Sequence, residues 1–355
     1  MKRRNHSDDV YQRIASMRSL VASRSTRTYQ PGKHNHLKKV FNRTKIDAPR
    51  LISFFSNTAY SEFFNFIKTL KRTAPKSKII IDLSAVAEVK VAAMLILYST
   101  IEQIQSKYGQ NHVKTIDCPT AYISGVFQRF GFWTLTKESR TRKKYYDRAA
   151  LDICSASFKS KQAGDNSQLR RAIQYVQEAI RDSGMDGEDG VKAFAAITES
   201  FSNVWQHAYD DDFYKIPLPD EEKCWWIAVE RINSQLFIAV YDSGVGIPTT
   251  LSKKPWYGEL IADLLTRLGM SGANDGLAIR AAVEYGNSRF KTGGRGKGLA
   301  EAKDFVSANP DGTMVIYSGS GSYEFKAANP EILESLPSSM AGTLIQWNLK
   351  LGSSS

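Results

Sequence analysis

The feature that most constrains the fold is an apolar run that ends in an acid and two alternate glycines. Residues 236–241, LFIAVY, predict a buried strand, and Asp242, Gly244 and Gly246 follow it in the sequence DSGVG. Glycine accepts backbone conformations and close approaches that other residues do not. Such a turn therefore lets the backbone come close to a flat ligand. Taken alone, it is equally explained as an ordinary connection after a strand.

A second feature is the amphipathic pattern of residues 191–209, VKAFAAITESFSNVWQHAY. At 100° per residue, one stripe of the predicted helix is apolar. The stripe contains Phe194, Ile197, Phe201, Val204, Trp205 and Ala208. Glu199, Asn203 and His207 are spaced four residues apart and gather on nearly the opposite face. By itself that polar face is explained as solvated surface.

A third feature is the glycine-rich segment 292–298, TGGRGKG, which precedes an amphipathic helix. The start of a helix presents backbone N–H groups and a positive dipole end to anions. Arg295 and Lys297 add positive charge at the same place. The spacing is neither that of a Walker phosphate loop nor that of a dinucleotide fingerprint.

The order and spacing of these three segments resemble the N, G1 and G2 boxes of the GHKL superfamily of ATP-binding proteins. A closing strand, residues 341–349, also fits, with Thr343 where the family keeps a threonine near the adenine. The resemblance covers residues 167–350. It implies a Bergerat fold, a two-layer α/β sandwich with a mixed sheet, that binds ATP and Mg²⁺. Residues 197–209 look closest to the anti-sigma-factor serine kinase branch.

The resemblance also implies roles for single residues. Asn203 would ligate Mg²⁺, and Glu199 would act as the catalytic base. Asp242 would accept a hydrogen bond from the adenine amine, with Thr343 supporting it. The remaining positions implied to contact the nucleotide are Gly244 and Gly246 beside the ring, and Gly294, Arg295, Gly296, Lys297, Gly298 and Leu299 around the phosphates.

The interval 249–291 corresponds to the ATP lid of this fold. Arg289 and Lys291 are its candidate contacts to the γ-phosphate. His207 lies near the base of the site, where we expect it to be a structural histidine. A role in the site is the alternative.

Residues 50–136 predict a separate small α/β domain. The strand 78–83, KIIIDL, the long apolar helix 91–109 and the segment 118–132, CPTAYISGVFQRFGF, carry a resemblance to STAS domains. In that family the turn before the long helix usually carries a phosphorylated serine. Here the turn, residues 88–91, reads EVKV and has no hydroxyl, so a docking or dimerisation role is expected. Residues 137–166 predict a connector.

Charge is concentrated at the amino terminus. The chain has a net charge of +12, of which residues 1–50 contribute +10. Residues 1–49 predict a basic arm and linker with a helix over residues 8–23. The basic residues within 1–50 could hold nucleic acid, an acidic protein surface or anionic lipid heads, or could serve only solubility.

Several classes of protein are disfavoured. No segment is apolar for about twenty residues, so no membrane span is expected. No apolar segment follows the basic start as in a signal peptide. Three separated cysteines (118, 154 and 224) predict reduced thiols in a cytoplasmic protein. The combination of STAS-like and ATP-binding domains that the two resemblances imply suggests a bacterial signalling or defence setting. None of the five histidines supplies a phosphoacceptor on a dimerising helix pair, which argues against a sensor histidine kinase.

Three functions stay open. The first, which we favour, is a slow ATPase that acts as a nucleotide-controlled switch on dimerisation or on a protein partner. The second is a serine kinase that phosphorylates a STAS-like partner. The third is an interaction protein that holds ATP as a structural ligand. Retention of Glu199 argues against the third, because binding alone needs no base.

Overall fold

The strands of this protein form two main sheets in two lobes of one compact unit, Lys39–Ser355. The computed structural model describes residues 39–138, 149–183, 187–285, 298–309, 311–327 and 329–351. We call residues 39–138 the amino lobe and residues 149–351 the carboxyl lobe. The predicted helix 8–23 lies outside the described residues.

The amino lobe has a four-stranded sheet in the order β1-β2-β4-β6. Both the β2–β4 and the β4–β6 pairs are parallel, and β1 is antiparallel to β2. The strands are β1 (Lys39–Val40), β2 (Arg43–Asp47), β4 (Ile79–Asp82) and β6 (Val113–Ile116), with β3 (Leu51–Ile52) and β5 (Glu88–Val89) forming a separate parallel pair. The helices are α2 (Asn57–Thr73), α3 (Val91–Tyr108), α4 (Ala121–Arg129) and α5 (Phe132–Leu135).

This lobe follows the predicted order of elements but begins earlier. β2 pairs with β4, so its residues belong to the sheet although they precede residue 50. Every residue of β4 is buried, as its apolar sequence predicts. Ser56 caps α2 by accepting a hydrogen bond from the Ala59 N–H at 3.3 Å, which fixes where that helix begins.

The carboxyl lobe is built on a five-stranded sheet in the order β10-β11-β9-β8-β7. Its strands are β7 (Ala149–Ser157), β8 (Cys224–Ile232), β9 (Gln235–Asp242), β10 (Thr313–Lys326) and β11 (Ile332–Lys350). Each of its four pairings is antiparallel. The mixed sheet that was predicted is therefore wrong for the described strands, because these neighbours run in opposite directions. β7 is an edge strand of this sheet, so most of the predicted connector 137–166 that the structure describes belongs to this lobe.

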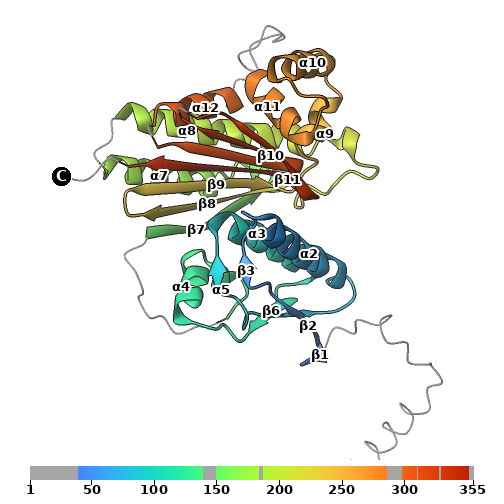
Figure 1. Cartoon of the computed structure of the whole chain (residues 1–355). Helices are drawn as coiled ribbons and strands as arrows, with labels where there is room; N and C mark the ends of the chain where they lie inside the picture. The colour runs from blue at the N-terminus through green and yellow to red at the C-terminus, as the bar shows by residue number, and fades with distance from the viewer. Residues whose placement is uncertain are drawn as a thin grey trace, which may run out of the picture. The chain divides into compact units, whose positions relative to one another are not determined.

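Helices cover one face of this sheet (Figure 1). They are α6 (Phe158–Gln162), α7 (Ser167–Arg181), α8 (Gly187–Asn203), α9 (Ile247–Ser252), α10 (Tyr257–Leu268), α11 (Asp275–Tyr285) and α12 (Gly298–Ser307), with a π-helical turn, η1 (Val204–Ala208), and a 3₁₀ turn, η2 (Asp211–Phe213). The described apolar residues of the stripe predicted on α8 pack into the core on this face, Ile197, Phe201 and Val204 among them.

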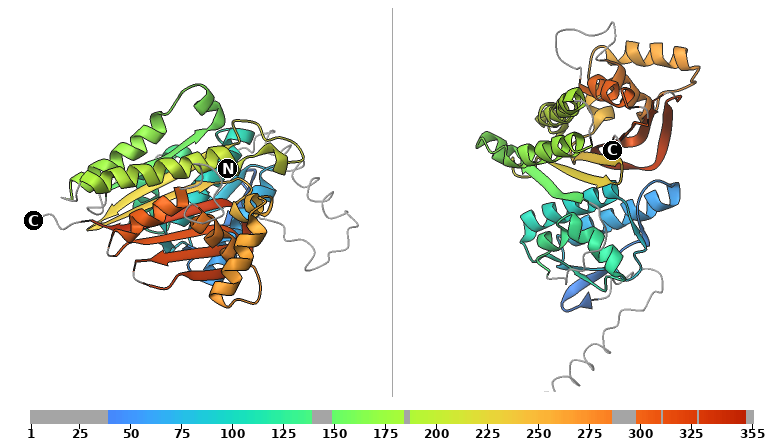
Figure 2. Two further views of the ribbon diagram at one scale, coloured as in Figure 1. Left: turned by 90° about the horizontal axis from the view of Figure 1, so that it is seen from above. Right: turned by 90° about the vertical axis from the view of Figure 1, so that its left-hand side faces the viewer.

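The amino lobe covers the opposite face of the same sheet, as Figure 2 shows from the side. Successive residues of β9 alternate between the two cores. Ile238 and Val240 pack with the helices of the carboxyl lobe, whereas Ala239 and Tyr241 pack with the amino lobe. The carboxyl lobe has the two layers that were predicted for it, and α2 and α3 add a third layer that was not.

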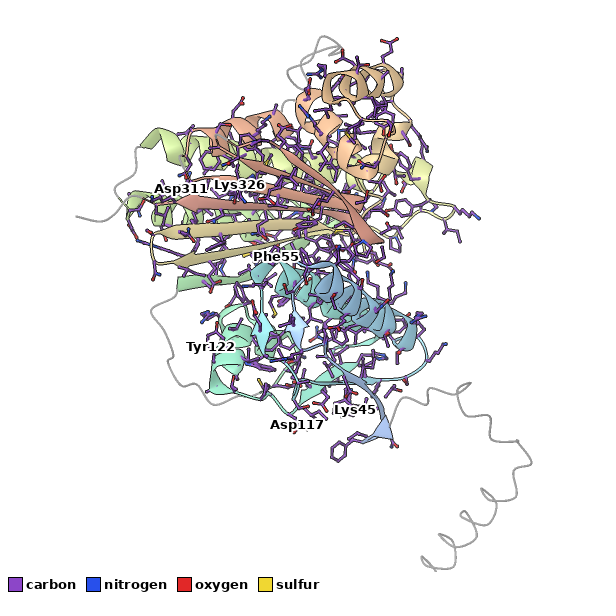
Figure 3. The ribbon with its side chains drawn as sticks, viewed as in Figure 1. Lys45, Phe55, Asp117, Tyr122, Asp311 and Lys326 are labelled. Atoms are coloured by element: carbon purple, nitrogen blue, oxygen red, sulfur yellow. The ribbon has the colours of Figure 1, made fainter. Side chains whose placement is uncertain are left out.

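Polar contacts join the two lobes around this apolar interface. The Tyr60 hydroxyl donates to the Ser338 carbonyl at 2.7 Å, and Arg129 pairs with the buried Glu230 at 3.1 Å. The Phe54 ring meets the Tyr317 ring edge-on, with 5.0 Å between the centroids. Its neighbour Phe55, labelled in Figure 3, is half exposed. Among the residues described, no helix is long and apolar enough to cross a membrane.

Candidate functional site

The candidate site is centred on Asp242, the last residue of β9. The carboxyl group is buried, with 5% of the residue exposed. Its Oδ1 accepts a hydrogen bond from the Gly244 N–H at 2.8 Å, which closes the turn after the strand. Burial raises the pKa of Asp242 to about 7, and the backbone N–H groups of Gly244 and Thr343 oppose that rise. The fold therefore places a hydrogen-bond acceptor at the end of a central strand, and the charge of this acceptor changes near neutral pH.

The turn after Asp242 rests on the end of the α8–η1 helix. The Val245 N–H donates to the Ala208 carbonyl at 2.9 Å. A Cβ atom at Gly244 would lie 2.1 Å from the same carbonyl oxygen, so only glycine fits. The π-helical turn η1 brings Ala208 to this position, and such turns often occur at functional sites. Two segments predicted to act together are thus in direct contact.

A second close contact joins the turn to β11. Thr343 is the register partner of Asp242 in the antiparallel β9–β11 pair. Gly342 has a φ of 75°, and a Cβ there would lie 1.9 Å from the Asp242 carbonyl oxygen. The predicted proximity of Thr343 to Asp242 is therefore present in the structure.

Ser318 is a member of this cluster that sequence reasoning missed. The residue is fully buried, and its hydroxyl accepts from the Ile247 N–H at 2.9 Å. The same oxygen lies 3.0 Å from the Gly342 carbonyl and 3.1 Å from the Thr343 hydroxyl. Ser318 thereby ties the turn to two strands. It lies in no recognisable motif, and only the β10–β11 register, which pairs it with Thr343, brings it here.

Gly246 has a packing role that the sequence analysis did not predict. Gly244 and Gly246 were expected to leave room for an adenine ring. The φ of Gly246 is 83°, and a Cβ there would lie 2.8 Å from the Ser318 hydroxyl oxygen. Protein atoms therefore occupy the space beside both glycines. Both are required by packing of the turn, whether or not a ligand approaches from another side.

Glu199 and Asn203 lie one turn apart on α8, and both are half-buried. Positions i and i+4 are neighbours on a helix surface, so the two side chains share a face as predicted. His207 follows in η1 and is exposed. The structural role expected for this histidine stays a prediction.

The phosphate-binding segment falls mostly outside the described residues. Arg289, Lys291, Gly294, Arg295, Gly296 and Lys297 are among those not described. Gly298 is the first residue of α12, and Leu299 is half-buried against the carboxyl-lobe core. α12 packs along α8, the helix that carries Glu199 and Asn203.

The predicted ATP lid is a folded part of the lobe over its described residues, 249–285. Leu260, Leu264 and Leu277 form a small core between α10 and α11. The Asp275 carboxylate accepts a hydrogen bond from the Ser320 N–H at 2.7 Å, which anchors the start of α11 to β10. Over these described residues α11 is packed into the body of the lobe, and the lid assignment stays a prediction.

The Asp242 carboxylate has acceptor positions beyond those used by its two backbone donors. A carboxylate has about four acceptor positions, so Asp242 can accept from an amine in addition to the two backbone N–H groups. In the described part of the chain, no three or more His, Cys, Asp or Glu side chains are placed to hold a metal ion. A magnesium ion would rely on the Asn203 amide and on phosphate oxygens, as Mg²⁺ sites commonly do.

No protein-family model matches this sequence, and no curated protein matches it.

Proposed function

We propose that the carboxyl lobe binds ATP with Mg²⁺ and hydrolyses it slowly, so that nucleotide occupancy controls a partner. One observation carries the proposal: the buried Asp242 turn is seated on the end of the α8–η1 helix, one turn beyond Asn203. An acceptor for a base and candidate groups for phosphate chemistry thus lie on two elements in direct contact.

In this proposal Asp242 accepts a hydrogen bond from the adenine amine. Guanine has a carbonyl at the corresponding position, which would meet the carboxylate as a second acceptor, so the site favours adenine. Ser318 and Thr343 hold the carboxylate and its turn in place. Asn203 holds Mg²⁺ through its amide oxygen. Glu199 orients and deprotonates the attacking water.

The first experiment measures ADP release and ATP binding by wild type, Glu199→Gln and Gln206→Ala. Gln206 is an exposed residue of the adjoining turn and serves as the control. We expect slow turnover in wild type and in the control. Glu199→Gln should keep ATP binding within about threefold and lose turnover by about 100-fold, because general-base catalysis contributes about 10²–10⁴. Absence of ATP binding by wild type would refute the proposal.

The serine kinase is the second candidate, supported by the likeness of residues 197–209 to the anti-sigma-factor kinase branch. Here the group activated by Glu199 would be a serine hydroxyl of a STAS-like partner, and the γ-phosphate would pass to its oxygen while ADP leaves. Radiolabelled ATP with candidate STAS-like proteins separates the two functions. A labelled partner serine supports the kinase. Free phosphate as the sole labelled product supports the switch.

A further inference from the structure

The amino lobe contacts the Asp242 turn through one hydrogen bond. Gln103 lies on α3, about one and a half turns before the helix ends at Tyr108. Its side-chain amide donates to the Ser243 hydroxyl at 2.8 Å. Ser243 follows Asp242 directly, so a helix of the other lobe reaches the residue beside the candidate adenine acceptor.

Ser243 is also held from within the carboxyl lobe. Its backbone N–H donates to the Tyr209 hydroxyl oxygen at 3.0 Å, and the two hydroxyl oxygens lie 3.2 Å apart. Tyr209 is buried, and its hydroxyl donates to the Cys224 carbonyl. Burial raises the pKa of Tyr209 well above its usual value, so the phenol stays neutral and remains a donor.

These contacts form a series of hydrogen bonds that runs from Gln103 to Cys224. The Gln103 amide donates to the Ser243 hydroxyl, whose own proton can point to the Tyr209 hydroxyl, and Tyr209 donates to the Cys224 carbonyl. The Tyr209 hydroxyl also accepts from the Ser243 backbone N–H, so two groups of Ser243 are held by it. Hydrogen bonds in such chains strengthen one another, so loss of the first donor weakens the position of the whole turn.

Other side chains of α3 already hold the two lobes together without Gln103. The neighbouring Glu102 already anchors α3 to the sheet, by accepting from the Trp226 indole at 2.5 Å and the Ser155 hydroxyl at 3.0 Å. Lys107, on the same helix, pairs with Glu222 at 3.0 Å without touching the turn. Gln103 therefore differs from its neighbours in touching Ser243.

We propose that Gln103 is a positioning residue of the nucleotide site, so that the amino lobe and the bound nucleotide affect each other through the Gln103–Ser243–Tyr209 chain. This rests on the proposed function. Coupling between two sites is reciprocal. A change in the amino lobe that displaces Gln103 therefore alters nucleotide affinity, and nucleotide binding reduces the mobility of the end of α3.

The test measures ATP dissociation constants for wild type, Gln103→Ala, Ser243→Ala, the double variant and the control Lys107→Ala. Gln103→Ala should weaken binding about three- to tenfold, the range expected for one neutral hydrogen bond. In the Ser243→Ala background the same change should cost less than about twofold, because its partner is gone. Lys107→Ala should leave affinity unchanged.

A second readout separates positioning from stability. In wild type, ATP should slow amide hydrogen exchange over residues 100–108, and in Gln103→Ala it should not. A purely structural bond would lower the melting temperature of Gln103→Ala without changing affinity or this exchange, and that result would overturn the inference while leaving the proposed function intact. Wild type that binds no ATP would overturn both.

Discussion

Burial raises the pKa of Asp242 to about 7, so the charge of this carboxyl changes within the physiological range. An aspartate in the unfolded chain ionises near pH 4. The folded protein therefore holds the proton more tightly between about pH 4 and pH 7. The free energy of unfolding attributable to this residue is highest at low pH and decreases as pH rises through that window.

Asp242→Asn removes the cost of burying this charge, so the loss of stability at high pH should disappear. Without nucleotide, the variant should be more stable than wild type at pH 8 by up to about 4 kcal/mol, since one pKa unit corresponds to about 1.4 kcal/mol. At pH 4 the two proteins should unfold alike. Urea unfolding from pH 4 to pH 8 measures this difference. A gap that does not grow with pH would contradict it. The same variant should bind ATP at least about tenfold more weakly.

Gly244 tests how tightly the turn is packed on α8–η1. Gly244→Ala places a Cβ 2.1 Å from the Ala208 carbonyl oxygen, and relief requires the turn to move, at a cost of about 1–3 kcal/mol. Gly258→Ala on α10 is the matched control, because a Cβ there meets no atom within 4 Å. The control should be neutral or stabilising by up to about 1 kcal/mol. Thermal unfolding of the two variants measures this difference. Equal melting temperatures would argue against the close approach of Gly244 to the Ala208 carbonyl.

At the scale of elements, an acid of α3 contacts the sheet of the other lobe. Glu102 is partly buried, and its carboxyl accepts from Trp226 and Ser155 at the lobe interface. Burial raises the pKa of Glu102, while these two hydrogen bonds oppose the rise. The same sign applies as for Asp242: stability from this group is greatest at low pH and falls as pH rises above the unfolded pKa near 4.

Glu102→Gln and Glu102→Ala should therefore differ in sign. The glutamine amide can accept from Trp226 with its oxygen and donate to Ser155 with its nitrogen, so it should be as stable as wild type or more stable at pH 8. Alanine leaves the Trp226 indole unpaired and should cost about 1–3 kcal/mol. Chemical unfolding at pH 8 distinguishes them. Equal destabilisation by both would show that the charge itself is needed.

The elements were largely predictable because their patterns are local. The apolar sequence of β4 and the stripe on α8 depend on neighbours along the chain. Ser318 was not predictable, because its place beside Thr343 and Ile247 depends on the register of a long hairpin.

At the scale of the molecule, the sequence contains a pattern that predicts the third layer. An antiparallel sheet with one solvated face alternates apolar and polar residues, whereas a sheet buried on both faces reads as a continuous apolar run. Residues 236–241 form such a run, and residues 225–229 of β8 form another. Both predict a second covering layer, which the amino lobe provides through α2 and α3.

Separating the lobes should therefore expose an apolar face. A chain that begins at residue 149 would uncover Trp226, Tyr241 and Leu344, which pack against the amino lobe. Exposed apolar patches of this kind cause association. We expect that chain to bind a hydrophobic dye, to elute as oligomers and to melt at a lower temperature than the full protein.

Removal of residues 1–38 is the matched control, because they lie outside the compact unit that contains both lobes. That shorter chain should stay unassociated and melt within about 2 °C of the full protein, since a loss of 1 kcal/mol in a domain of this size shifts the midpoint by about 2–4 °C. If the chain from residue 149 is also monodisperse and equally stable, the amino lobe is not needed to cover the sheet. The contact of Gln103 with the Asp242 turn would then be the main role of the lobe interface.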